Sequence, residues 1–282
     1  MLALLAAAAI TAIAYAVVVA PRRLRLTTID APIPGLPAAF DGYTIAVLSD
    51  IHHGAVWGSR THLKRAITLA HAAAPDLIAL LGDYGLSHHR LPRASRRAYE
   101  RAMPVMGPLL RSLHAPDGVV AVIGNHDYDY DASAVAAWLR ETGSRVLVNE
   151  AVCIERAGAR LAISGVDDAA SGKIDPHAGC AHLEPHVPRI VLSHNPDGVL
   201  SLATDARVDL VLSGHTHGGQ VVLPFVGALS RRCKLCGRHT ARGWVPNPRA
   251  PLYVTSGVGA IIPLRVHCPP EVLVVRLRPR AG

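Results

Sequence analysis

After residue 40, short continuous apolar runs alternate with segments whose apolar residues recur at helical spacing. A continuous apolar run bounded by turn residues is typical of a strand buried on both faces. The pattern predicts strands over residues 43–50, 75–83, 118–127, 145–148, 151–156, 160–165, 188–197, 208–217, 220–224, 252–255 and 271–277. It predicts helices over residues 59–74, 95–113 and 132–142. Pro104 and Pro108 are expected to bend or split the second of these helices.

This alternation predicts one layered α/β domain over residues 41–282. Because so many of the expected strands are buried on both faces, we expect a four-layer α/β/β/α sandwich, in which two mixed sheets pack together with helices outside. A three-layer doubly wound sheet is the alternative that the pattern leaves open.

The first twenty residues contain no charge and read as a separate apolar helix. A helix of this length spans about 30 Å, which matches the hydrocarbon core of a bilayer. We therefore expect a transmembrane anchor over residues 1–21. A signal peptide cleaved after Ala16 and a buried core helix are the alternatives. Residues 22–40 hold three prolines and a glycine over 32–37, and are predicted to form a linker.

The composition narrows the classes of partner. Apolar residues make up 50% of the chain and charged residues 18%, which excludes a disordered chain. The net charge of +8 suits a surface that meets phosphate or anionic lipid. Aromatic residues make up only 4% and no basic block is interleaved with them, so no nucleic acid partner is expected.

Five cysteines do not suggest a disulfide framework in a chain of 282 residues. Cys233 and Cys236 form a CxxC pair without a second CxxC to complete a zinc site. We expect reduced loop cysteines, with a small structural metal site or a redox pair as the alternatives.

Metal-binding side chains follow five of the predicted strands. The strand ends carry Asp50 and His52, then Asp83, then Asn125 with His126 and Asp127, then His194, and finally His215 and His217. One such strand end would be weak evidence because Asp and Gly commonly follow strands as turn formers. Five together are not expected by chance, and ligands gather where strands of α/β sheets end.

The donor set has a chemical meaning. Carboxylate, imidazole and amide groups without thiolate suit Mn²⁺, Fe or Zn²⁺, and we expect Mn²⁺. Seven donors are too many for one tetrahedral ion but suit two octahedral ions that share a ligand. Two ions about 3.5–4 Å apart can hold a hydroxide and clamp a phosphate for in-line attack.

The motifs Asp50-x-His52, Gly82-Asp83, Gly124-Asn125-His126-Asp127, His194 and Gly214-His215-x-His217 resemble the signature of the calcineurin-like metallophosphoesterases. The resemblance implies that Asp50, His52 and His217 bind one ion. It implies that Asn125, His194 and His215 bind the other ion, and that Asp83 bridges the two. His126 would act beside the leaving group as a catalytic residue, and Asp127 would orient it. The implied reaction is hydrolysis of a phosphodiester or diphosphate bond by a metal-bridging hydroxide.

Residues 214–228, 255–265 and 269–277 resemble a membrane-associated branch that includes UDP-2,3-diacylglucosamine pyrophosphatases. A lipid-linked substrate of that kind is the expectation from this likeness. The alternatives are a phosphodiesterase or phosphomonoesterase with a soluble substrate, and an inactive metal-binding interaction domain. Arg265 is a candidate contact for substrate phosphate, with a solvated arginine as the alternative.

The location follows from the apolar helix and the arginines behind it. Arg22, Arg23 and Arg25 come directly after the apolar segment. The positive-inside rule places such residues in the cytoplasm. We therefore expect a single-pass protein of the bacterial inner membrane with a cytoplasmic catalytic domain.

Overall fold

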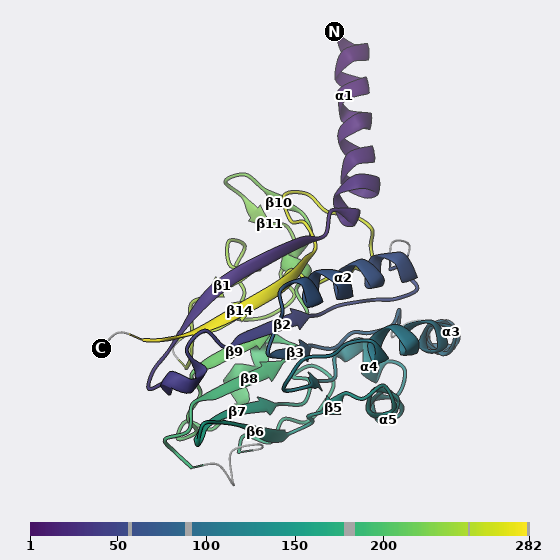
Figure 1. The fold of residues 1–282 in the computed structure, drawn as a ribbon. Coiled ribbons are helices and arrows are strands. Elements are labelled where there is room, and N and C mark those ends of the chain that lie inside the picture. Colours follow the sequence, from purple (N-terminus) through teal and green to yellow (C-terminus); the bar gives the residue numbers. More distant parts are fainter. Residues whose placement is uncertain (56–57, 88–91, 178–183, 248, 281–282) are drawn as a thin grey trace.

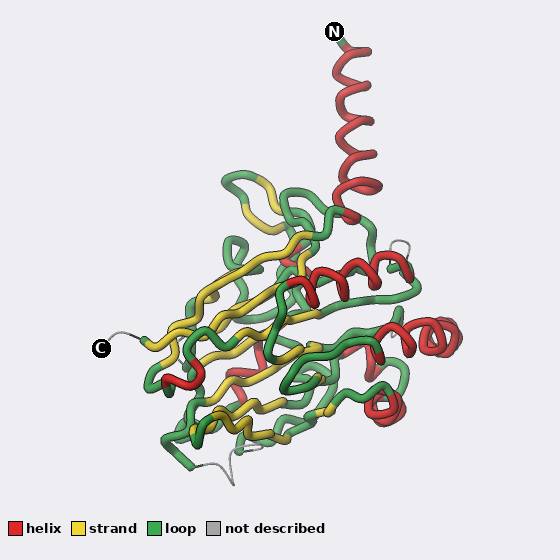
Figure 2. Tube along the Cα trace, viewed as in Figure 1, coloured by secondary structure: helices red, strands yellow, loops and turns green. Residues whose placement is uncertain are grey.

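The structure is a computed structural model that describes all residues except 56–57, 88–91, 178–183, 248 and 281–282. Two six-stranded sheets pack against each other, and the long helices of the domain are grouped on one side, outside the strands (Figures 1 and 2). The two mixed sheets flanked by helices confirm the expected sandwich.

The first sheet has the strand order β1-β14-β2-β3-β4-β5. Its strands are β1 (Arg25–Ile33), β14 (Glu271–Pro279), β2 (Thr44–Leu48), β3 (Leu77–Leu80), β4 (Val119–Ala121) and β5 (Arg145–Val146). Strands β2 to β5 run parallel, and β14 is antiparallel to β2. The parallel strands therefore end at one common edge.

The second sheet has the order β12-β13-β9-β8-β7-β6. Its strands are β12 (Gly243–Val245), β13 (Leu252–Val254), β9 (Leu210–Ser213), β8 (Arg189–Ser193), β7 (Ala159–Gly165) and β6 (Glu150–Arg156). Strands β7, β8, β9 and β13 are parallel. A small hairpin of β10 (Val222–Leu223) and β11 (Gly227–Ala228) lies outside both sheets.

The helices of the domain are α2 (Arg60–Ala72), α3 (Pro92–Arg111), α4 (Asn125–Tyr128) and α5 (Ala132–Glu141). Helix α2 begins after Ser59, whose hydroxyl accepts a hydrogen bond from the backbone of His62. Helix α3 continues through Pro104 and Pro108, so these prolines do not split it.

The core explains the continuous apolar runs. Ile45 and Val47 of β2 pack toward the second sheet, while Ala46 and Leu48 pack toward the helices. Both faces of the strand are buried, so every position is apolar. The outer face of the second sheet packs against loops and the short 3-10 helix η4 (Pro196–Ser201), which supply the fourth layer.

The predicted linker over residues 22–40 is wrong for residues 25–33. These residues form β1, an edge strand that pairs in parallel with β14 over nine positions. The strand is largely exposed, so its apolar pattern is weak. Pro32 lies within it, which an edge strand tolerates because one side of its backbone needs no partner.

The N-terminal helix stands apart from the domain. Every residue of α1 (Leu2–Ala14) is exposed, and Figure 1 shows the helix projecting away from the sheets. Together with η1 (Tyr15–Val19) and η2 (Ala20–Arg22) it gives 21 residues that are long and apolar enough to cross a membrane. The exposure of these residues excludes the alternative of a buried core helix.

Candidate metal centre

The structure brings all seven predicted ligands to the edge where the parallel strands of both sheets end. Asp50 and His52 follow β2, and Asp83 follows β3. The remaining four lie at the start of α4 and after β8 and β9: Asn125, His194, His215 and His217. Segments more than 160 residues apart in the chain therefore share one site.

The first group of donors consists of Asp50, His52 and His217. The Nε2 atoms of His52 and His217 lie 3.2 Å apart, and Asp50 Oδ1 lies 3.6 Å from His217 Nε2. Asp83 Oδ2 lies 3.5 Å from His52 Nε2 and 3.3 Å from His194 Nε2. The Asp83 carboxylate thus lies between this group and the next.

The second group consists of Asn125, His194 and His215. Asn125 Oδ1 lies 3.1 Å from His194 Nε2 and 2.8 Å from His215 Nδ1. The two ring nitrogens are 3.3 Å apart. Metal–ligand bonds of about 2.1 Å place adjacent ligands about 3 Å apart in an octahedron, so these spacings fit a coordination sphere.

Backbone carbonyls fix which ring nitrogens face the centre. A carbonyl can only accept, so His194 Nδ1 donates to Leu81 O at 2.6 Å and His217 Nδ1 donates to Gly259 O at 3.2 Å. His215 Nε2 donates to Arg232 O at 3.0 Å. The opposite nitrogens therefore face the carboxylates, which is the arrangement that bound cations require.

Burial keeps two of these imidazoles neutral. Burial lowers the pKa of His52 to about 3 and that of His215 to about 4. Both rings therefore present lone pairs at pH 7. Burial also raises the pKa of Asp50, and the neighbouring charge of Asp83 adds to this effect. A concentration of buried anionic and lone-pair donors is the electrostatic environment that divalent cations stabilise.

The backbone is strained where the ligands leave the strands. Asp50, His52, Asp83, His215 and His217 all have positive φ, between 43° and 68°. Non-glycine residues adopt this region at a cost of about 1–3 kcal/mol each, and they cluster at functional sites. The strain turns each chain sharply at the strand end and aims its side chain at the centre.

Two glycines make the close approach possible. A Cβ atom on Gly124 would lie 2.3 Å from Asp83 Oδ1, and one on Gly214 would lie 1.9 Å from Ser49 Oγ. Any larger residue would therefore displace the carboxylate of Asp83 or the loop that carries Asp50.

His126 lies beside the donors but does not have the predicted partner. Its ring meets the ring of His52 edge-on at 5.2 Å between centroids. Its Nδ1 lies 3.1 Å from Asp129 Oδ2 and 3.1 Å from Ser87 Oγ. The expectation that Asp127 orients this ring is corrected by the structure, because Asp129 is the carboxylate in contact with it. Asp129 lies one helical turn from His126, a spacing that brings two side chains to one face.

Asp127 is instead buried, and its carboxylate accepts hydrogen bonds from three segments of the chain. Its Oδ2 accepts hydrogen bonds from the backbone N–H groups of Gly124 at 2.7 Å and Asp83 at 2.9 Å. Its Oδ1 accepts from the N–H of Tyr84 at 3.0 Å and from the hydroxyl of Tyr99. Burial and the charge of Asp83 raise its pKa to about 6, so it is mostly ionised at pH 7.

Arg265 also differs from its prediction. The side chain is buried, and its guanidinium donates to the carbonyls of His217 at 2.8 Å, Ser256 at 2.9 Å and Gly259 at 2.6 Å. Its donors thus support the backbone behind His217, and the candidate role in substrate contact is corrected to a structural one. The sequence does not distinguish the two roles, because both require an arginine in a loop.

Arg232 is the cation that the sequence analysis missed. Burial lowers its pKa, and the charges of Asp50 and Asp83 oppose this effect, so its guanidinium lies within electrostatic range of the donors. Its backbone oxygen holds His215, and its side chain donates to Gln220 Oε1 at 3.0 Å. Arg232 directly precedes the CxxC pair in the sequence. This proximity to an unexplained motif was the only sequence signal that could have pointed to Arg232 as part of the site.

A comparison with known families and proteins agrees with this geometry. The calcineurin-like phosphoesterase family matches residues 43–219, which include all five strand-end motifs and all seven donors. The chain belongs to the calcineurin-like phosphoesterase family.

Relatives of this phosphoesterase align over most of its length. An uncharacterized metallophosphoesterase of Bacillus subtilis, YkuE, is 32% identical over 97% of this chain and 93% of its own length. Phosphodiesterase YaeI of Escherichia coli is 31% identical over 83% of this chain and 82% of its own. UDP-2,3-diacylglucosamine pyrophosphatase LpxG of Chlamydia muridarum is 27% identical over 91% of this chain and 90% of its own. The chain is therefore a metal-dependent hydrolase of the phosphoesterase type.

The cysteines of this phosphoesterase are not all reduced. Cys233 and Cys236 form a disulfide, so the expectation of reduced loop cysteines is wrong for this pair. The backbone N–H groups of Lys234 and Leu235 donate to the carboxylate of Asp197. The disulfide loop is thereby fixed directly after Arg232, whose backbone oxygen accepts the hydrogen bond from His215.

Proposed function

We propose that the chain hydrolyses a phosphodiester or diphosphate bond at a two-metal centre. In this proposal Asp50, His52 and His217 hold one ion, and Asp83 is shared with a second. The ligands of that second ion are Asn125, His194 and His215. The observation that carries the proposal is the convergence of ring nitrogens, positioned by backbone carbonyls on the opposite side of each ring, on two carboxylates. Two divalent ions bound there supply Lewis-acid activation of the phosphate and a water-derived nucleophile at neutral pH.

The protein's own groups complete the chemistry. His126 Nδ1 is held by Asp129 at 3.1 Å, which leaves Nε2 to donate a proton to the departing oxygen. The backbone N–H of His126 donates to Asp83 Oδ1 at 2.9 Å, so the ring and the shared carboxylate are positioned together. The guanidinium of Arg232 stabilises the negative charge that develops on the phosphate.

We propose Mn²⁺ as the metal, since oxygen and imidazole donors without thiolate suit it. We also propose a lipid-linked diphosphate, of the UDP-2,3-diacylglucosamine type, as the substrate. The apolar N-terminal span and the likeness to the Chlamydia muridarum pyrophosphatase support it. The main alternative is a soluble phosphodiester, which the likeness to the Escherichia coli phosphodiesterase favours.

The test is hydrolysis by the full chain in detergent, with Mn²⁺, of a UDP-linked lipid and of bis(p-nitrophenyl) phosphate. Turnover of the lipid at the higher kcat/KM supports the proposed substrate, and equal or faster turnover of the small diester refutes it. Asp83→Asn should abolish both activities. Full activity of Asp83→Asn would refute the shared-ligand role, and the absence of activity on any phosphate ester would favour an inactive metal-binding domain.

The orientation in the membrane is a separate proposal. Arg22, Arg23 and Arg25 directly follow the apolar span, and we propose a cytoplasmic domain in the bacterial inner membrane on this basis. The Cys233–Cys236 disulfide predicts the opposite face, since structural disulfides persist in oxidising compartments. A C-terminal alkaline phosphatase fusion tests the orientation, because its activity would place the domain outside the cytoplasm.

A further inference from the structure

We infer that the domain docks on the surface of an anionic phospholipid bilayer through a second element besides its anchor, the apolar hairpin of residues 221–229. This segment reads VVLPFVGAL and contains no charged or hydrogen-bonding side chain. It includes β10 and β11. Phe225 at its tip is fully exposed, and Leu223, Val226 and Leu229 are between 37% and 55% exposed. Apolar side chains gathered at the tip of a projecting hairpin indicate a surface that binds an apolar partner.

The hairpin is linked to the anchor by a short chain of backbone contacts. Val222 N–H donates to Val266 O at 3.0 Å, and Arg265 N–H donates to Ala16 O at 3.0 Å. Ala16 lies within the apolar span. Figure 1 shows the hairpin extending beyond the sheets on the side from which the anchor leaves the domain. A bilayer crossed by the anchor would therefore lie next to the tip of the hairpin.

The surface between the anchor and the domain has an apolar part that suits acyl chains and a basic part that suits lipid headgroups. A groove of about 940 Å³ lies between them and is lined by side chains of the anchor and of residues 264–269, with Arg23 and Arg25 at its edge. Acyl chains beside the anchor would fill its apolar part. The same bilayer would bring phosphate groups to the level of the two arginines.

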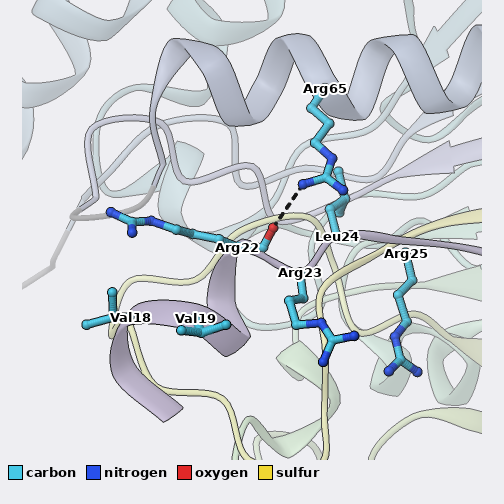
Figure 3. Close-up of a pocket in the computed structure, with 7 residues that line it drawn as sticks. All are labelled: Val18, Val19, Arg22, Arg23, Leu24, Arg25 and Arg65. Carbon is cyan, nitrogen blue, oxygen red and sulfur yellow. Dashed lines mark hydrogen bonds between the residues drawn. The ribbon is translucent and has the colours of Figure 1, made fainter. Parts of the chain in front are cut away.

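An arginine cluster marks this level. It consists of Arg22, Arg23, Arg25 and Arg65, which line a second pocket (Figure 3). Arg65 comes from α2 and donates to the backbone oxygen of Arg22 at 3.3 Å, so the domain and the end of the anchor contribute to one basic surface. Arg231, which is exposed, likewise follows the apolar hairpin. Apolar tips flanked by arginines match a bilayer whose headgroups are anionic.

The hairpin also connects the bilayer to the metal centre. It follows directly on Gln220, which is three residues from His217 and whose amide donates to the carbonyls of Ile262 and Leu264. Arg232 follows its other end and holds His215. A hairpin docked in the bilayer would therefore set the position of the donors relative to the membrane surface.

The experiment measures contact with lipid in the full chain, without metal or substrate. Phe225→Trp is placed in vesicles of phosphatidylcholine and phosphatidylglycerol, with and without brominated acyl chains. Interfacial segments are buried about 5–10 Å at the headgroup–acyl boundary, so we expect brominated lipid to quench the added emission about twofold or more. The control is Val105→Trp. Val105 is 38% exposed and belongs to α3, a helix that Figure 1 shows apart from the anchor. Its added emission should not change.

The charge requirement is tested in the same assay. The double substitution Arg25→Gln and Arg65→Gln should remove any preference for phosphatidylglycerol over phosphatidylcholine vesicles. Absence of quenching of the Phe225→Trp emission above the wild-type background, in either lipid, would overturn the inference. The inference would also be overturned if a second copy of the chain covered the hairpin, which would be detected as cross-linked dimers in the vesicles. Because the readout needs no hydrolysis, a failure of the proposed enzymatic function would leave this result interpretable.

Discussion

The structure predicts different effects for two similar substitutions: Asp127→Asn should reduce stability, and Asp129→Asn should reduce catalysis. Asp127→Asn replaces one carboxylate oxygen by an NH₂ group in a site where four donors converge: the N–H groups of Gly124, Asp83 and Tyr84 and the hydroxyl of Tyr99. In either amide orientation at least one backbone N–H loses its acceptor. The tyrosine hydroxyl can turn and accept, but a backbone N–H cannot.

The cost can be estimated from the lost contacts. A buried donor left without a partner costs about 1–3 kcal/mol, and hydrogen bonds to an ionised group are stronger than neutral ones. We therefore expect Asp127→Asn to lower the free energy of unfolding by about 2–3 kcal/mol. This corresponds to a fall in Tm of about 4–12 °C for a domain of this size.

Asp129→Asn should act on catalysis instead. Its carboxylate is partly exposed and contacts His126 and Ser87, so Tm should stay within about 2 °C of the wild type. General acid catalysis contributes about 10²–10⁴-fold, and loss of the orienting carboxylate should lower kcat about 10–100-fold with little change in KM.

The assay combines thermal unfolding of the full chain by circular dichroism in detergent with hydrolysis of bis(p-nitrophenyl) phosphate at saturating Mn²⁺. His126→Ala supplies the reference for loss of the acid. The reasoning is refuted if Asp127→Asn keeps the wild-type Tm and has the pH–rate profile of His126→Ala, since Asp127 would then orient the ring.

Three further predictions follow from the site and the core. Arg232→Ala should raise KM for a phosphate diester about 10-fold or more by removing a charge-assisted contact, whereas Arg265→Ala should chiefly lower Tm; similar KM changes in both would contradict this assignment. Gly124→Ala should lower Mn²⁺ affinity, measured by calorimetry, since its Cβ would meet Asp83 Oδ1 at 2.3 Å; unchanged affinity would exclude the steric argument. Burial alone would raise the pKa of Asp76, but hydrogen bonds from Thr44 and Arg156 outweigh burial and lower this pKa. The ionised Asp76 therefore stabilises the folded state above about pH 4, and this stabilisation is lost as the pH falls further. Asp76→Asn should therefore lower Tm at pH 7, and its difference from the wild type should shrink as the pH falls below about 4; a constant difference would refute the linkage.

The sequence alone determined the layered architecture and the identity of the donors. Strands such as β2 and β3 are buried on both faces, so their composition marks them without knowledge of their neighbours. The polar residues after them, such as Asp50 and Asp83, must then lie at the common edge of a parallel sheet. Local pattern and topology agree at these positions, which is why the structure brings the predicted donors together.

Only the tertiary structure decided which side chains meet. Whether Asp127 or Asp129 contacts His126 depends on the direction in which each side chain leaves the short helix α4 and the turn after it. Edge strand β1 forms only because β14, more than 240 residues later, supplies its backbone partners. The backbone of Arg232 meets His215 because the long loop after the apolar hairpin folds back, whereas the guanidinium of Arg265 is occupied by the carbonyl of His217. Contacts between distant segments carry no local sequence signal, so burial and hydrogen bonding had to be seen in the folded chain.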